Sequence, residues 1–153
     1  MIQLKTDKLS QLGQELQIAK SLYSRIIGCG NNENFDIYCK LLDKRNEALN
    51  RISNQISPEL SAMEPHLIQK AQVELKKMSV ALNKVFNTYH HEKLLKVCIE
   101  HEERIFDIMK AVLEEVRLND DDRQIMAIEL ATTIEILAEL KASYEVYKHT
   151  VVS

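Results

Sequence analysis

Histidine and cysteine are the residue types in this chain best suited to metal or acid–base chemistry, and the sequence holds five and three of them, respectively. Cys98 and His101 are three positions apart, so they face one side of the helix expected around them. A structural zinc site normally needs four ligands, and this pair supplies two. None of the histidines has Glu three residues before it, as carboxylate-bridged di-iron bundles require. We therefore predict no metal site and no cofactor.

A second histidine pattern is the run His90-His91-Glu92-Lys93. This run is similar to a pattern in four-helix phosphotransfer domains, which carry a His followed three residues later by a Lys. Those domains usually have Gly at the next position, where this chain has Leu94. Histidine-based signalling or metal binding, through His90 or His101 on the fourth helix, is therefore kept only as the alternative function.

Other catalytic patterns are weaker still. Three glycines are too few for a phosphate-binding loop, and Ser, His and Asp show no triad motif. The acidic groups Glu100, Glu102-Glu103 and Glu114-Glu115 match only loosely the facing carboxylates of Mg²⁺-dependent helical hydrolases. We interpret them as a solvated helix face. The sequence predicts no catalytic residue, and we expect a protein that is not an enzyme.

The charge distribution limits the kinds of partner that we expect, and the cysteines indicate the cellular compartment. Residues 1–91 carry a formal charge of about +3 and residues 92–153 about −6, for a net −3. This imbalance is too small for a nucleic-acid interface, which usually needs a clustered basic surface. The odd cysteine count without a CxxC pair favours a reducing compartment. No secretory signal and no membrane span are expected, so we predict a cytoplasmic protein.

The elements that must position these residues are long amphipathic helices. Apolar residues recur at steps of three and four along nearly the whole chain, and only three Gly and two Pro interrupt it. The sequence predicts a single all-α domain over residues 1–153, an antiparallel helical bundle of four to five helices. The expected helices cover residues 6–27, 34–57, 65–88, 91–118 and 120–148.

The predicted boundaries follow from turn and capping residues. Gly28-Cys29-Gly30-Asn31-Asn32 should end the first helix. Pro58 marks a restart after Ser57, and a short turn leads from there to Pro65. The break near residues 87–91 rests on low helix propensity, and one unbroken helix of about 50 residues is the alternative. The run Asn119-Asp120-Asp121-Asp122 should cap the last helix.

The last helix carries two apolar stripes. One is expected to fill a groove in the bundle and contains Met126, Leu130, Ile134, Leu137, Leu140, Tyr144 and Tyr147. The second contains Ile125, Ile128, Ile136 and Val146. Either this helix sits centrally and both stripes are intramolecular, or the second stripe binds another protein or a second copy of the chain. We predict the latter, so these four residues are the candidate partner-binding site.

The N-terminal hairpin resembles small flagellar export chaperones of the FliT/FlgN kind. The similarity covers residues 9–60 and consists of a Leu-rich helix, a polar loop at 31–34, and a pattern in the second helix formed by Tyr38, Leu41-Leu42, Lys44-Arg45, Leu49 and Ile52. Within that pattern Arg45 interrupts an otherwise apolar line. The resemblance implies a cytoplasmic bundle that holds an export substrate, with the terminal helix covering or forming the binding surface. The predicted function is that of a chaperone, adaptor or inhibitor.

Overall fold

Every regular element in the described part of the chain is a helix, so the all-α prediction is confirmed. The computed structural model describes residues 2–28, 35–88 and 91–152, and the side chains of residues 7–28, 36–77 and 91–148. Its elements are α1 (Ile2–Gly28), α2 (Phe35–Arg51), the π-helical turn η1 (Ile52–Ile56), α3 (Pro58–Thr88), α4 (His91–Glu115) and α5 (Asp120–Val152). Cys29 and the predicted turn at residues 29–32 lie outside the described residues.

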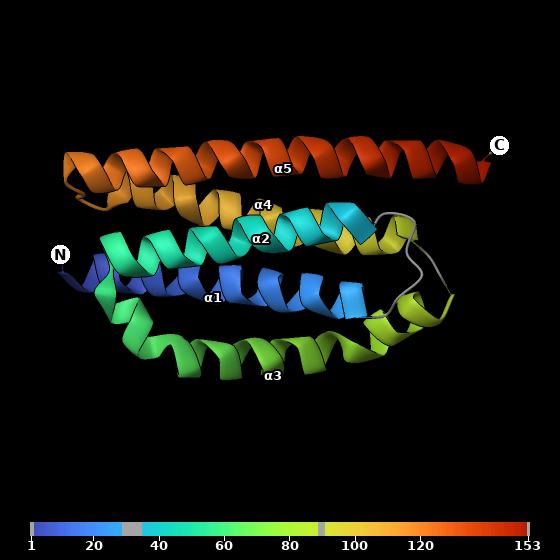
Figure 1. The fold of residues 1–153 in the computed structure, drawn as a ribbon, viewed down its shortest axis with the longest axis horizontal. Helices are drawn as coiled ribbons and strands as arrows, with labels where there is room; N and C mark the ends of the chain where they lie inside the picture. Colours follow the sequence, from blue (N-terminus) through green and yellow to red (C-terminus); the bar gives the residue numbers. More distant parts are fainter. Residues whose placement is uncertain (1, 29–34, 89–90, 153) are drawn as a thin grey trace.

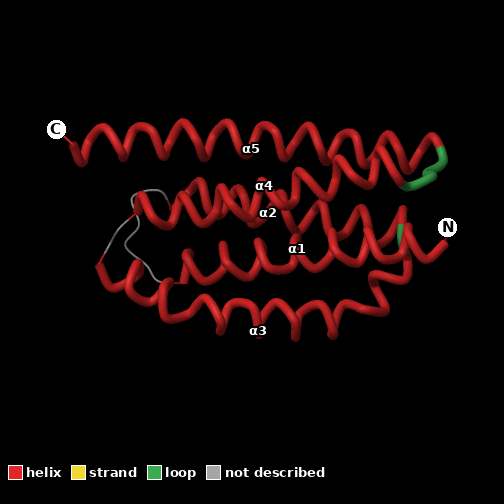
Figure 2. Tube along the Cα trace, turned by 180° about the vertical axis from the view of Figure 1, so that it is seen from behind, coloured by secondary structure: helices red, strands yellow, loops and turns green. Residues whose placement is uncertain are grey.

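The helices run roughly parallel to one long axis, with α3 at one edge of the bundle and α5 at the other (Figure 1). Helix α1 packs against α2, α3 and α4, whereas α5 packs mainly on α4 and only slightly on α2 and η1. The reverse view shows the same order of elements (Figure 2). Each edge helix therefore keeps a broad face turned away from the bundle.

The core of the described part of the chain is built mainly from leucine and isoleucine. Leu9, Leu12, Leu16 and Leu22 of α1 are almost fully buried. Gly13 lies between them and allows α3 to come close, since an added Cβ would lie 3.2 Å from the side chain of Leu67 and 3.3 Å from that of Leu60. The apolar stripe of α1 thus fixes the contact with three neighbouring helices.

The predicted turn between Pro58 and Pro65 is wrong. Helix α3 runs unbroken from Pro58 through Pro65. Pro58 suits the first helical position, where no N–H is needed. Pro65 lacks the N–H that would bond to the carbonyl of Ser61, but Ser61 is exposed, so water can satisfy that carbonyl. The chain instead turns earlier, where Ser57 N–H donates to the Ile52 carbonyl at 2.8 Å.

The two later boundaries agree with the sequence. Helix α3 ends at Thr88 and α4 begins at His91, so the alternative of a single long helix is wrong. Asn119 caps α5 as predicted, because its Oδ1 accepts from the backbone N–H of Asp122 at 2.8 Å. Helix α4 ends at Glu115, three residues before the expected limit, and α5 continues to Val152.

Candidate functional site

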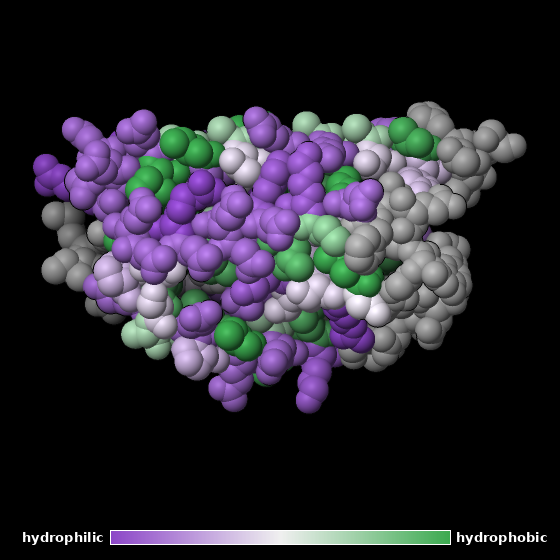
Figure 3. Space-filling view, viewed as in Figure 1, coloured by the Kyte–Doolittle hydropathy of each residue, from purple (hydrophilic) through white to green (hydrophobic). Residues whose placement is uncertain are grey.

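The side of α5 that points away from the bundle exposes apolar side chains. Ile128 and Ile134 are each 51% exposed and Val146 is 64% exposed. Ala127, Ala131, Ala138 and Ala142 are exposed between them. We call these seven residues the α5 outer face. In the space-filling view, apolar surface is visible along the edge formed by α5, interspersed with polar side chains (Figure 3).

The four residues predicted as a binding stripe do not share one environment. Ile128 and Val146 lie on the α5 outer face. Ile136 is fully buried and Ile125 is partly buried against the core. Eight helical residues advance the side-chain direction by about 80° beyond two full turns, so Ile128 and Ile136 cannot point the same way. The stripe as predicted is therefore corrected: Ile136 belongs to the core.

The opposite correction applies to Ile134. The sequence placed it with Met126 and Leu140 on the inward face, but it is half-exposed while those two are fully buried. The buried side of α5 is instead completed by two polar residues, Glu129 and Thr133, both with no exposed surface. Polar residues inside and an isoleucine outside explain why the apolar pattern misjudged this helix.

Glu129 and Thr133 belong to a buried charge cluster that joins four helices. At its centre Arg45 of α2 donates to Glu102 of α4 through Nε at 2.8 Å and through a second nitrogen at 2.6 Å. The same guanidinium donates to Thr133 Oγ1 of α5 at 3.0 Å. Tyr23 of α1 donates its hydroxyl to Glu102 at 2.9 Å. Arg45 and Glu102 have no exposed side-chain surface.

The cluster continues along α5 through a second pair. Arg51 Nε lies 2.7 Å from a carboxylate oxygen of Glu129. Burial raises the pKa of Glu129, and the charges of Arg51 and Arg45 oppose that rise. For Arg45, burial lowers the pKa, but the charge of Glu102 outweighs it and the net pKa is raised. Acid and base therefore alternate from Glu102 to Arg51, and their formal charges cancel.

The buried charge cluster is better suited to holding the helices in a fixed register than to catalysis. Two hydrogen bonds join Arg45 and Glu102 and fix which groups face each other, although such a pair adds little net stability over an apolar core. Within the described part of the chain, Arg45 Nη1, Arg51 Nε and both carboxylate oxygens of Glu129 are buried without a hydrogen-bond partner, so the cluster is only partly satisfied. Burial and Glu102 also raise the pKa of Tyr23, so its hydroxyl keeps its proton and remains a donor. The cluster thus sets the register of α1, α2, α4 and α5 against one another.

Sequence reasoning found only part of this cluster. Arg45 was visible because it interrupts an apolar line. Glu102 was assigned to a solvated face, and Glu129 and Thr133 were not singled out. Tyr23 was not singled out from the sequence either, and its side chain is fully buried.

The residues considered for metal or phosphate chemistry are dispersed. Cys98 is fully buried, and burial raises the pKa of its thiol, so it stays protonated. His101 is 4% exposed, and His91 packs beside the rings of Tyr38 and Tyr147. Within the described ranges, no three His, Cys, Asp or Glu side chains group as metal ligands would. His90 lies outside the described residues.

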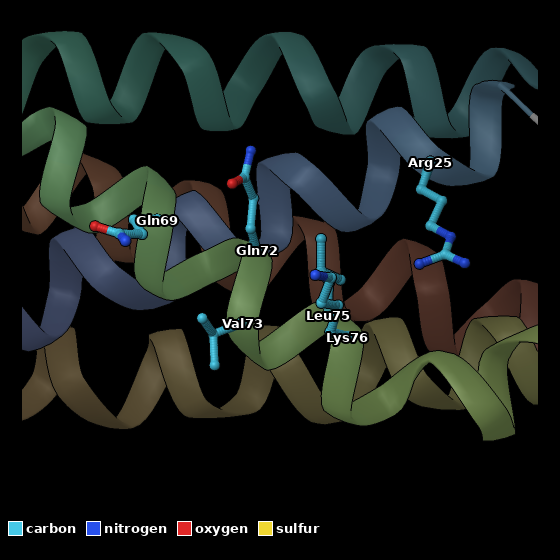
Figure 4. Close-up of a pocket in the computed structure, with 6 residues that line it drawn as sticks. All are labelled: Arg25, Gln69, Gln72, Val73, Leu75 and Lys76. Atoms are coloured by element: carbon cyan, nitrogen blue, oxygen red, sulfur yellow. The ribbon is translucent and has the colours of Figure 1, made fainter.

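Two grooves border the exposed side of α3. One, of about 470 Å³, lies between α1 and α3 and is lined by Arg25 of α1 and by Gln69, Gln72 and Lys76 of α3 (Figure 4). Val73, 48% exposed, lines both this groove and a second one that reaches α4. The α3 edge therefore presents a hollowed surface that is lined by both polar and apolar side chains.

Two further findings bear on the kind of protein this is. No helix in the described ranges has a stretch that is both long and apolar enough to pass through a membrane. Comparison with known proteins adds no relative, because no family model, curated protein or solved structure matches the chain.

Proposed function

We propose that this chain is a non-enzymatic interaction protein, a chaperone, adaptor or inhibitor, that docks a partner protein on the α5 outer face. The observation that carries the proposal is the exposure of three large apolar side chains on one helix. Among the described side chains four large apolar ones are exposed, and Ile128, Ile134 and Val146 are three of them. Apolar residues gathered in this way mark interaction surfaces more often than single ones do.

The energetics support a moderate affinity. Complete burial of an isoleucine or valine contributes about 1.5–3 kcal/mol, and Ile128 and Ile134 are already half-covered by the fold. Their remaining surface therefore offers about half that contribution each. The exposed alanines allow another helix to approach closely, which adds contact area. After the entropic cost of association, this supports affinity in roughly the micromolar range.

The buried side of the same helix supports its role as a stable platform. Thr133 and Glu129 tie α5 to Arg45 and Arg51 in the bundle. Because these contacts fix the rotation of α5 about its own axis, the same residues always face outward. A partner would meet a preformed surface, so little ordering of this face would be needed on binding.

An export chaperone is the specific form of this role that the hairpin at residues 9–60 suggests. In that reading the partner is an export substrate held against the terminal helix. Tyr38, Leu41 and Ile52, which carry the resemblance, are fully buried. They therefore support the scaffold, and the substrate-holding role would fall to α5.

The test compares Ile128→Asp/Ile134→Asp with Val73→Asp, a matched change of an exposed apolar residue on α3. Each variant is used as bait in extract from the native cell, next to the unchanged protein. We expect the α5 variant to lose the partner that the unchanged protein captures, and the Val73 variant to retain it. Equal capture by both variants would contradict the proposal, as would equal loss.

Sedimentation of the purified protein at micromolar concentration separates the two kinds of partner. A dimer that Ile128→Asp/Ile134→Asp converts to a monomer would identify a second copy of the chain as the occupant. A monomer in both cases leaves a different protein as the partner. A dimer that persists in the α5 variant would place self-association elsewhere and remove this face from it.

A further inference from the structure

The second groove beside α3 is lined by three helices and holds buried polar atoms that lack partners. It encloses about 540 Å³ between α1, α3 and α4. Gln14 Oε1, Glu15 Oε2 and His101 Nδ1 are buried and have no hydrogen-bond partner within the described part of the chain. All three residues line this groove. Unpaired buried polar atoms are costly, so their convergence on one hollow calls for an explanation.

The three atoms do not satisfy one another. His101 Nδ1 lies 3.7 Å from Glu15 Oε2, which is beyond hydrogen-bond range. The His101 side chain is 5% exposed and that of Glu15 is 19% exposed, so neither is well hydrated. Gln14 and Glu15 are only partly buried as whole residues, and both line the groove. Two of the three atoms are oxygen acceptors, and one of those is a carboxylate.

The walls around these acceptors are partly apolar. Ile18 of α1 and the half-exposed Val73 of α3 line the same hollow. An aliphatic chain with a polar group at its end, such as an arginine side chain, can pack on these walls and bring that polar group to the acceptors. Glu74 adds a second carboxylate from α3, although Lys77 lies 3.4 Å from it.

Two cations also line the groove, and both are exposed to solvent. Lys70 and Arg104 are exposed, and within the described ranges neither forms an ion pair with Glu15. Their charges are hydrated and screened, whereas the acceptors of Gln14 and Glu15 are shielded from water. The inner part of the groove therefore favours a donor-rich cation.

We propose that this groove binds a guanidinium group, carried either by an arginine side chain of a polypeptide or by a free small molecule. A guanidinium presents five N–H donors in a planar fork, which can reach a carboxylate and a second acceptor together. Here Glu15 accepts from the fork, Gln14 Oε1 accepts a further N–H, and the stem packs on Val73 and Ile18. The groove lies across α1, α3 and α4, so the proposal is independent of the α5 outer face.

The test follows backbone amide signals of the full chain by two-dimensional NMR while a probe is added. The probe is Nα-acetyl-arginine amide, and its matched control is Nα-acetyl-citrulline amide, which has nearly the same shape without the charge. We expect the arginine probe to shift signals of residues 14–18, 73 and 101 and to bind with Kd in roughly the millimolar range. The citrulline probe should bind at least about tenfold more weakly.

Variants decide whether Glu15 is the acceptor. Glu15→Gln keeps the shape and removes the charge, and we expect it to weaken arginine binding by about tenfold. Glu103→Gln, at an exposed position on α4, should leave the affinity unchanged. Thermal unfolding of both variants checks that they fold. Equal shifts with citrulline, undiminished binding by Glu15→Gln, or shifts confined to another surface would each overturn the proposal.

Two further probes distinguish the source of the group. Agmatine offers the guanidinium on a short free chain, and acetyl-Ser-Arg-Ser-amide offers it within a peptide. Tighter binding of the peptide than of the blocked amino acid would assign the groove to a polypeptide partner. Tighter binding of agmatine would assign it to a free small molecule. Either result supports the guanidinium site, and failure of both probes to bind contradicts it.

Discussion

Replacement of Arg45 by methionine should destabilise the protein far more than loss of an ordinary ion pair. Arg45 and Glu102 have no exposed side-chain surface, and two short bonds join them. The Arg45→Met variant keeps most of the volume but leaves the Glu102 charge in the core, with only the Tyr23 hydroxyl as donor. Removing one partner of a buried pair costs about 3–5 kcal/mol, and we expect this cost here.

Glu102→Leu is the second variant of a double-mutant cycle. It leaves the Arg45 guanidinium buried without its carboxylate partner, so it should lower the free energy of unfolding by a similar amount. In Arg45→Met/Glu102→Leu neither charge remains to be desolvated. The residual penalty is then mainly the Tyr23 hydroxyl without its acceptor, about 1–3 kcal/mol. We therefore expect the double variant to be no less stable than either single variant, with a coupling energy of about 3 kcal/mol or more.

Urea unfolding followed by far-UV circular dichroism measures all three variants. Lys40→Met is the matched control, because Lys40 also reaches from α2 to α5, where its ammonium lies 3.6 Å from Glu139 on the surface. That pair should contribute less than about 1 kcal/mol. Single-variant losses as small as this control, or a double-variant loss equal to the sum of the singles, would refute the account of the cluster.

Three further changes test separate parts of the structure. Ile136→Asp should lower the free energy of unfolding in urea by about 3–5 kcal/mol, because the side chain of Ile136 is fully buried. Ile128→Asp should lower it by less than about 1 kcal/mol, and similar losses for the two variants would contradict the assigned faces of α5. Tyr23→Phe removes the bond to Glu102 and should cost about 1.5–3 kcal/mol, and a neutral result would mean that this bond contributes nothing. Burial raises the pKa of Glu129 in the folded protein, so the folded state binds this proton more tightly than the unfolded state does. The contribution of Glu129 to stability therefore falls as pH rises from the unfolded pKa, about 4.3, through the folded pKa. Glu129→Gln should therefore gain stability relative to the unchanged protein as pH rises above about 4.3, and a constant difference would contradict the raised pKa.

The helices were predictable because their signal is local. The three- and four-residue spacing needs only the neighbouring sequence, and the cap at Asn119 follows from its own position. Pro65 misled the prediction because a proline inside a helix is normally costly. Ser61, one turn earlier, is exposed, so water can satisfy the carbonyl that Pro65 leaves without a donor, and this exposure depends on the packing of α3.

The faces of α5 were harder to predict because their determinants are distant in sequence. Thr133 is inside because Arg45, 88 residues earlier, donates to it. Glu102 is inside because the same arginine, 57 residues earlier, pairs with it. Apolar periodicity treats both as surface residues. Once Thr133 and Glu129 occupy the inner side of α5, the rotation of this helix turns Ile134 outward and Ile136 inward.

Site-specific photocrosslinking tests the central claim, that the α5 outer face is where a partner binds. A photoreactive phenylalanine analogue is placed at position 134 and, as the control, at position 62, which is exposed on α3 and lines neither groove, and each protein is irradiated in its native cell. The account predicts a discrete crosslinked protein, or a crosslinked dimer, from position 134 that is absent from position 62. No crosslink from position 134, or the same products from both positions, would contradict it.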